Sequence, residues 1–215
     1  MRIRDIMTSD PVTIQPETPV HHAQQTIREH KIRNLPVVQE GKLVGMVTYD
    51  ILMEVSPSKA TGLSLHEIHY ILAEMKVEDI MDRNPVVVSP DTPLEHALVQ
   101  IQNRAVRGFP VVENEKLVGI ATRGDIIRLL AGALGLQEEG IRITIEGLGL
   151  RLGELGEIIS IFDRNQALVL SMMTLPAREK KDWIAVIRLK TKDVTTVEED
   201  LKRAGFRISY VDQPV

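Results

Sequence analysis

Residues 5–50 read DIMTSDPVTIQPETPVHHAQQTIREHKIRNLPVVQEGKLVGMVTYD, and residues 79–125 repeat this pattern 74 positions later as DIMDRNPVVVSPDTPLEHALVQIQNRAVRGFPVVENEKLVGIATRGD. The two stretches share DIM, a TP pair, PVV and LVG, all at the same offset. Matches at one fixed offset indicate two copies of one supersecondary unit that pack against each other. A duplicated unit forms paired, quasi-symmetric clefts at its own interface, and such clefts are natural ligand sites. The repeat therefore favours a sensor over a catalyst.

Each copy predicts the same order of elements, β-α-β-β-α. Short runs of β-branched residues favour strands, apolar residues at helical spacing favour helices, and short polar connections favour hairpins. The predicted strands are 12–14, 36–38 and 43–47 in the first copy, and 86–88, 110–112 and 117–121 in the second. The closing helices are predicted from about 51 and from about 125 to 134, and a further helix at about 65–75.

The first helix of each copy is predicted to start at a Thr-Pro pair, Thr18-Pro19 and Thr92-Pro93. Threonine is a favourable N-cap, and proline fits the first helical position because its missing N–H is not needed there. Glu95 stands three residues after the threonine of the second copy and completes a predicted capping box. His21 fills that place in the first copy, so the box is predicted for the second copy alone.

The composition of the 215-residue chain is that of a globular protein, with 43% hydrophobic and 26% charged residues. No run of 18 apolar residues is present, and the N-terminal residues lack the pattern of a signal peptide. The absence of cysteine excludes disulfides and thiolate metal sites. We therefore expect a cytoplasmic protein without a membrane partner. The net charge of −4, with no basic stripe, predicts no nucleic-acid partner.

The pattern changes after the second copy. From residue 141 the order strand, helix, strand, strand, helix, strand predicts a small α+β domain, in which two helices cover one face of an antiparallel sheet. The expected fold class is thus α/β for the repeats and α+β for the tail. The predicted boundaries are 1–56 for the first copy, 57–76 for a linker helix, 77–135 for the second copy, 136–140 for a linker and 141–215 for the last domain.

The repeated unit resembles the cystathionine-β-synthase (CBS) domain. The resemblance rests on Asp-Ile-Met, a short strand near a proline, a helix, Pro-Val-Val, Leu-Val-Gly and then Thr and Asp, and it covers about 2–130. A tandem pair of such domains is often called a Bateman module. The resemblance implies a pseudo-symmetric pair that holds an adenosine-containing ligand in its cleft.

The tail resembles an ACT domain, which implies a ferredoxin-like βαββαβ fold. This resemblance rests on the run 153–158, GELGEI, and on Ser171. A CBS pair followed by an ACT domain in a chain this short resembles the acetoin-utilisation protein B family, which implies a role in acetoin or related carbon metabolism.

The tail departs from the ACT pattern at 150–152 and 166–168, positions that help such domains bind amino acids. The departure argues against an amino-acid site and favours a homodimer formed through the sheet. Apolar residues at 168–170 and 172–173 are candidate contacts for pairing, and the alternative is that they belong to an ordinary intramolecular core.

The CBS resemblance implies an adenine nucleotide (AMP, ADP or ATP) as a regulatory ligand, and the second copy has suitable residues for it. Asp125, near a helix start, is placed to accept from both ribose hydroxyls. Thr122 and Arg107 offer groups for phosphate, although Asp125 as a cap and Arg107 as a surface ion-pair partner remain alternatives. Gly108 lets a backbone approach closely. The candidate site is Val87, Val88, Arg107, Gly108, Phe109, Pro110, Thr122 and Asp125.

The first copy has one residue fewer between its threonine, Thr48, and its aspartate, Asp50. At a helix start a one-residue deletion turns a side chain by roughly 100°, so Asp50 is expected to miss the ribose. The sequence therefore predicts two unequal sites. The weaker cleft is predicted from Thr13, Ile14, Arg33, Asn34, Leu35, Thr48 and Asp50.

Motifs for catalysis are scarce. The chain has no G-x-x-x-x-G-K-[ST] loop and no serine in a nucleophile motif. His66 and His69 lie three residues apart, but two histidines without a third ligand do not predict a metal site. We therefore expect a non-catalytic regulatory protein, without a catalytic cofactor and with an unidentified protein partner. The alternatives are a ligand-free scaffold and an amino-acid sensor that acts through the tail.

Overall fold

The computed structural model describes residues 1–55, 74–104, 106–149, 151–178 and 181–212. The chain divides into two compact units, Met1–Ile126 and Ile127–Val215. The helix predicted at about 65–75 lies almost wholly outside the described residues, as do His66 and His69. Among the described residues no group of three or more His, Cys, Asp or Glu side chains is placed to hold a metal ion.

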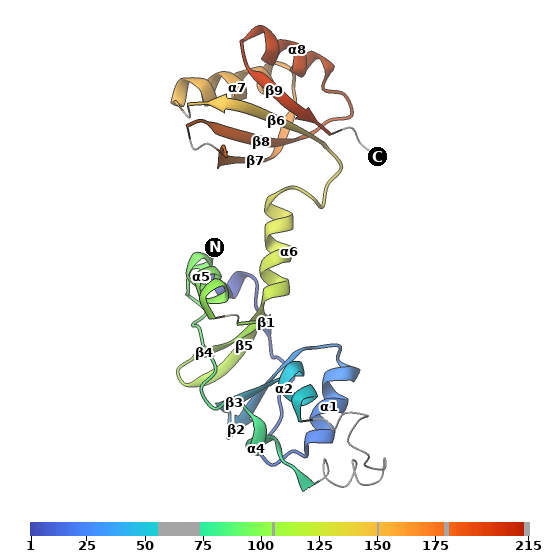
Figure 1. Cartoon of the computed structure of the whole chain (residues 1–215), viewed down its shortest axis with the longest axis vertical. Coiled ribbons are helices and arrows are strands. Elements are labelled where there is room, and N and C mark those ends of the chain that lie inside the picture. The colour runs from blue at the N-terminus through green and yellow to red at the C-terminus, as the bar shows by residue number, and fades with distance from the viewer. Residues whose placement is uncertain (56–73, 105, 150, 179–180, 213–215) are drawn as a thin grey trace. The chain divides into compact units, whose positions relative to one another are not determined.

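Two β-hairpins form the centre of the first unit (Figure 1). The first hairpin consists of β2 (Asn34–Gln39) and β3 (Lys42–Thr48), and the second of β4 (Gly108–Glu113) and β5 (Lys116–Thr122). The pairing repeats at the 74-residue offset, with Asn34 opposite Thr48 and Gly108 opposite Thr122. The short strand β1 (Thr8–Ser9) joins the edge of β5. Each of the predicted strands 12–14 and 86–88 contributes one parallel bridge, Ile14 to Val37 and Val88 to Val111.

Two helices accompany each hairpin, so the predicted order α-β-β-α is confirmed in both copies, whereas the first predicted strand of each copy is present only as a single bridge. They are α1 (Val20–Glu29) and α2 (Tyr49–Glu54) in the first copy, and α5 (Leu94–Arg104) and α6 (Arg123–Ala133) in the second. The apolar face of α1 is fully buried at two of its residues, Val20 and Ala23, which pack on strand residues of β2 and β3.

The predicted helix starts and the predicted capping box are wrong. The first helices begin at Val20 and Leu94, so each threonine lies two residues before the first helical residue. The Thr18 hydroxyl accepts a hydrogen bond from the Gln15 amide at 3.2 Å, and the Thr92 hydroxyl accepts one from the Ser89 amide at 3.0 Å. Threonine therefore closes the turn that precedes the helix, because its hydroxyl reaches the backbone of that turn.

The leading segment of each copy packs against the other copy. The Ile3 amide donates to the Thr92 carbonyl at 3.0 Å, and the buried Ile3 side chain belongs to the apolar cluster of Phe109. In the same way the Val77 amide, at the start of the short helix α4 (Val77–Ile80), donates to the Thr18 carbonyl at 2.9 Å. The two copies are thus interlocked, which boundaries drawn along the sequence do not show.

The second unit has the predicted βαββαβ order. Its elements are β6 (Ile141–Leu148), α7 (Leu152–Arg164), β7 (Leu168–Pro176), β8 (Trp183–Lys190), α8 (Thr195–Arg203) and β9 (Arg207–Val211). The strands pair antiparallel in the order β7-β8-β6-β9, and the two helices cover one face of this sheet (Figure 1). Alternate residues of β6 and β8, among them Ile143 and Ile187, are buried beneath the helices.

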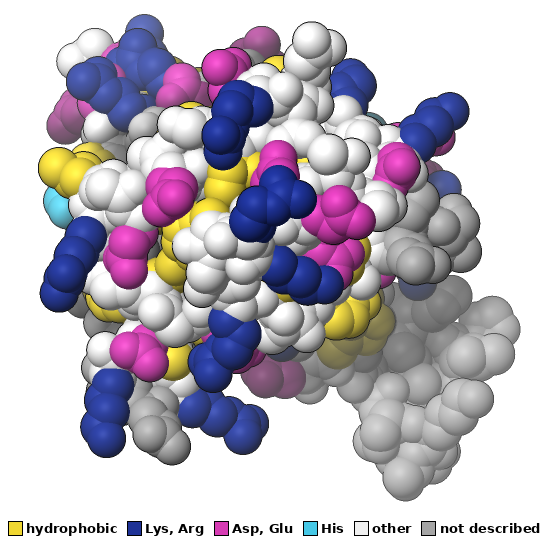
Figure 2. Space-filling view, turned by 90° about the horizontal axis from the view of Figure 1, so that it is seen from above, with side chains coloured by type: hydrophobic (Ala, Val, Ile, Leu, Met, Phe, Trp, Pro, Cys, Tyr) yellow, Lys and Arg dark blue, Asp and Glu magenta, His cyan; other side chains and the backbone are white. Residues whose placement is uncertain are grey.

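The surface carries charges of both signs. Figure 2 shows one face of the molecule, on which Lys and Arg side chains are interspersed with Asp and Glu. This face has no continuous basic stripe of the kind that binds nucleic acid. Within the part of the chain that the structure describes, no helix is long and apolar enough to cross a lipid bilayer.

Candidate functional site

The junction between β5 and α6 is closed by reciprocal hydrogen bonds. The Asp125 carboxylate accepts from the Thr122 amide at 2.8 Å and from the Thr122 hydroxyl at 2.6 Å, and the Asp125 amide donates to the Thr122 hydroxyl at 3.3 Å. This is a capping box in which aspartate takes the third helical position. Thr122 is therefore the N-cap of α6, whereas the sequence alternative had Asp125 itself as the cap; Asp125 takes part from the third helical position, and its half-buried carboxylate is held in a fixed orientation.

The corresponding junction of the first copy is built differently. Thr48 is the N-cap of α2 and accepts from the Ile51 amide at 3.3 Å. Asp50 is the second helical residue instead of the third, and its carboxylate pairs with two arginines, Arg33 at 3.4 Å and Arg107 at 3.1 Å. The missing residue has thus given the two aspartates different partners, which agrees with the predicted change of direction.

The candidate residues of the second copy lie on neighbouring segments. The Val88 amide donates to the Pro110 carbonyl, and Gly108 lies opposite Thr122 in the hairpin. Val87 is 49% exposed and presents an apolar surface. Phe109 is fully buried in the core, so only its backbone is able to contact a ligand. The structure therefore brings together the segment around Val88, the β4–β5 hairpin and the start of α6. Among the apolar candidates, Val87 is exposed and Phe109 is buried.

Gly108 is closely packed against the other copy. A β-carbon at this position would lie 2.9 Å from Cγ and from Nδ2 of Asn34, the equivalent residue of the first copy. Asn34 is only 8% exposed, and its Oδ1 has no hydrogen-bond partner among the described residues. The sequence predicted that Gly108 admits a ligand, but the group that approaches it is the Asn34 amide.

Arg107 points toward the first copy. Its guanidinium pairs with Asp50 at 3.1 Å. Arg33 pairs with the same carboxylate, and its guanidinium carbon lies 4.5 Å above the centre of the Tyr49 ring. The candidate residues of the two predicted clefts therefore meet at Asp50.

The remaining residues of the predicted first cleft differ in their exposure to solvent. Leu35 is fully buried in the core of the first copy, while Thr13 is exposed and Ile14 is half-buried beside β2. Leu35 therefore contributes backbone only to any cleft. Among the candidate residues of this cleft, Thr13, Arg33 and Asp50 have side chains that are accessible to solvent.

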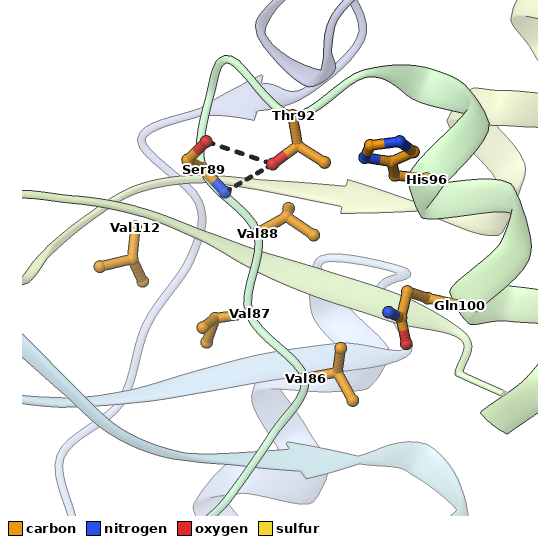
Figure 3. Close-up of a pocket in the computed structure, with 8 residues that line it drawn as sticks. All are labelled: Val86, Val87, Val88, Ser89, Thr92, His96, Gln100 and Val112. Atoms are coloured by element: carbon orange, nitrogen blue, oxygen red, sulfur yellow. Dashed lines mark hydrogen bonds between the residues drawn. The ribbon is translucent and has the colours of Figure 1, made fainter.

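A hollow of about 460 Å³ opens beside the segment 86–89 (Figure 3). Val86 and Val88 lie on the side of α5, close to His96 and Gln100, whereas Val87 and Val112 lie on the other side of the segment. Only Val87 and Val88 of this lining were predicted from the sequence. The full lining is Val86, Val87, Val88, Ser89, Thr92, His96, Gln100 and Val112.

Sequence reasoning missed the polar residues of this lining, among them His96 and Gln100. They lie four residues apart on α5, so the helical period places both on one face of the helix. That spacing was the signal available in the sequence. Their proximity to the segment 86–89 follows only from the fold.

The first unit thus consists of two interlocked copies of a hairpin-and-helix unit, each with a polar strand-to-helix junction. The model of the CBS domain family matches residues 3–58 and 77–132, which is more than half of the chain. The chain belongs to the CBS domain family and carries a tandem pair of these domains.

The similarity between this chain and its curated relatives covers part of this chain and a smaller part of each relative. The L-aspartate semialdehyde sulfurtransferase of Methanocaldococcus jannaschii is 32% identical over 133 residues, which is 60% of this chain and 23% of that protein. The chain thus spans about a quarter of the length of the first curated relatives that it matches. The likeness does not extend over the whole of those proteins.

Solved structures that are similar to this chain include the following three. The CBS domain pair of protein MJ0100, in complex with 5′-methylthioadenosine and S-adenosyl-L-methionine, is 28% identical, with a TM-score of 0.51 over 61% of this chain and 97% of that one. CBSX2 of Arabidopsis thaliana in complex with AMP is 30% identical, with a TM-score of 0.51 over 64% and 98%. A protein assigned to acetoin utilization (AcuB) from Vibrio cholerae is 25% identical, with a TM-score of 0.53 over 64% and 95%.

Proposed function

We propose that this chain is a non-catalytic regulatory protein whose CBS pair binds an adenine nucleotide. The observation that carries the proposal is the grouping of Val87, Gly108, Thr122 and Asp125 on adjacent segments of the second copy. Solved relatives of the same pair hold AMP in one case and two other adenosine compounds in another. An apolar surface suits a base, and an oriented carboxylate suits two ribose hydroxyls.

The second-copy junction is the stronger site in this proposal. Asp125 is fixed by its cap, whereas Asp50 is engaged by two arginines. A carboxylate held in one orientation is preorganised for a ligand and loses less freedom on binding. Two unequal sites follow, with the site at Thr122 and Asp125 filled first.

A thermal-shift screen with AMP, ADP, ATP, S-adenosyl-L-methionine and the amino acids tests this function. A ligand at a hundredfold excess over its dissociation constant stabilises the folded state by about 2.7 kcal/mol. A rise in melting temperature with adenosine compounds supports the proposal. No rise with any of them favours a ligand-free scaffold, and a rise with amino acids alone favours a sensor in the second unit.

For the second unit we propose an ACT-like role in homodimer formation. The sheet face opposite the helices carries apolar residues of neighbouring strands, with Leu175 opposite Ile184 and Met173 opposite Val186. Leu175 is 42% exposed, and β7 stands at the edge of the sheet. Exposed apolar surface on a sheet face is a common basis for symmetric pairing.

A matched pair of substitutions tests the homodimer. Leu175→Glu places a charge on the open face and should convert a dimer to a monomer in light scattering. Ile159→Glu places the same charge at a 52% exposed position of α7, and it should leave the dimer intact. A monomeric parent, or equal effects of both substitutions, would contradict pairing through this face.

A further inference from the structure

The segment that follows α6 is docked onto the sheet of the second unit. Residues 134–140, named here the strap, lead from α6 into β6. The Ser171 hydroxyl donates to the Leu134 carbonyl at 2.9 Å, and the Arg188 guanidinium donates to the Glu138 carbonyl at 3.1 Å. Most of this segment was predicted to be a linker, but side chains of β7 and β8 hold it in place.

A glycine lets the strap lie close to the sheet and ends α6. Gly135 is buried and has a φ of +68°, and a β-carbon there would lie 3.2 Å from Cδ of Arg188 and from Cβ of Leu170. The Leu136 amide donates to the Ala131 carbonyl at 3.0 Å, which is the pattern of a Schellman motif. The end of the helix and the docking of the strap therefore depend on the same residue.

The strap lies on the sheet face opposite the helices. Ile187 and Leu189, the neighbours of Arg188 in β8, are fully buried in the core beneath the helices. Because side chains alternate along a strand, Arg188 is directed to the open face, and Ser171 lies opposite it in β7. The strap therefore lies beside the apolar residues of β7 and β8 that we propose for homodimer formation.

The middle of α6 is exposed. Ile126 is buried in the core of the second copy, whereas Ile127 and Leu130 are 59% and 43% exposed. An isolated helix shorter than about 12–15 residues is marginal in water, and α6 has 11 residues. Its stability therefore depends largely on its two ends, which are the capping box of Thr122 and Asp125 and the docked strap.

The two ends of α6 belong to different units, because the division of the chain falls between Ile126 and Ile127. Helix formation is cooperative, so loosening the first turn weakens a short helix as a whole and with it the last turn. By thermodynamic reciprocity, release of the strap weakens the first turn by the same coupling free energy.

We propose that α6 is a cooperative link, in which a stable junction of Thr122 and Asp125 favours docking of the strap on the open face of the sheet. The strap opens locally, without unfolding of the sheet behind it. A ligand bound at the junction therefore increases the docked fraction of the strap. This last consequence rests on the proposed function, whereas the link itself does not.

Hydrogen exchange of the full chain, followed by NMR, tests the link without a ligand. The amides of residues 134–136 close the last turn of α6 and report on its opening. Asp125→Ala removes a capping carboxylate and should speed their exchange by up to about fivefold. Gly132→Ala should slow it by up to about fivefold, because alanine favours the helix and its β-carbon would come no closer than 3.8 Å to Gln137.

Asp79→Ala is the matched control. It removes the corresponding capping-box carboxylate from α4 in the same unit, where Asp79 accepts from the Lys76 amide at 2.9 Å. This substitution should leave the exchange of residues 134–136 unchanged. An unchanged exchange rate in Asp125→Ala, or an equal rise in Asp79→Ala, would overturn the link.

Addition of AMP separates the link from the proposed function. AMP should slow the exchange of residues 134–136 severalfold in the parent, and Ser171→Ala, which releases Leu134, should weaken AMP binding severalfold. If AMP binds in calorimetry and the exchange does not change, the link fails and the proposed function stands. If Asp125→Ala speeds the exchange and AMP does not bind, the link stands and the proposed function fails.

Discussion

The close contact between Asn34 and Gly108 predicts that substitutions at these two positions have interdependent effects on the stability of the first unit. In Gly108→Ala the new β-carbon would lie 2.9 Å from two Asn34 atoms and 3.2 Å from a third, which is closer than real side chains pack. Asn34 is 8% exposed and has little room to move. Inserting a methyl group into such a site costs about 1–3 kcal/mol. We expect Gly108→Ala to lower the free energy of unfolding of the first unit by that amount.

Asn34→Ala should rescue the variant. It removes the obstructing amide together with a buried Oδ1 that lacks a hydrogen-bond partner among the described residues, so by itself it should be nearly neutral. The double variant should then recover most of the loss, with a coupling energy of about 1–2 kcal/mol. Gly124→Ala is the matched control. Its β-carbon meets only Thr122 Oγ1 at 3.5 Å, so alanine in α6 should be neutral or stabilising by up to about 1 kcal/mol.

Urea unfolding followed by circular dichroism measures these effects. Trp183, the single tryptophan of the chain, lies in the second unit, and its fluorescence reports on that unit separately. The fluorescence transition should not move in any of these variants. The reasoning is refuted if Gly108→Ala unfolds at the same urea concentration as the parent, or if the two substitutions are additive.

Three further predictions concern the first unit. Asp125→Ala removes a cap and should cost about 1 kcal/mol, and it should abolish the nucleotide-induced rise in melting temperature; an unchanged rise would place the ribose elsewhere. Ile3→Ala should cost about 2–5 kcal/mol in urea unfolding because Ile3 is fully buried in the second copy, whereas a loss below about 0.5 kcal/mol would contradict the interlocked packing. The hydrogen bond from Arg2 lowers the pKa of Asp91 below its ordinary value of 3.8, so the stabilising contribution of Asp91 is present above about pH 4 and is lost as the pH falls through the lowered pKa. Asp91→Asn should therefore lower the melting temperature at neutral pH and approach the parent in acid, and an equal difference at both pH values would contradict the assignment.

The elements of the fold were predictable because local signals agree with them. The offset repeat indicated two equivalent units, and the elements from 141 onward follow the predicted order of strand, helix, strand, strand, helix and strand. The helix starts at Val20 and Leu94 were mispredicted, because a threonine before a proline fits a turn as well as an N-cap. The packing of Ile3 into the opposite copy was not predictable, since nothing local in the sequence indicates the partner.

The types of residue in the candidate site could be predicted from the sequence, but several of the contacts that these residues make could not. The one-residue difference between Thr48–Asp50 and Thr122–Asp125 correctly indicated different surroundings for the two aspartates. The pairing of Arg107 with Asp50 was missed, because it joins residues 57 positions apart that meet only where the copies touch. The burial of Phe109 also depends on the assembled core.

Calorimetric titration of the parent chain with AMP tests the central claim most directly. The account predicts saturable binding in which the first equivalent per chain binds much more tightly than any second one. It also predicts that Asp125→Ala abolishes the tight event, while the weaker cleft of the first copy is unaffected. Absence of binding by AMP, ADP and ATP, or two equal sites that survive Asp125→Ala, would contradict it.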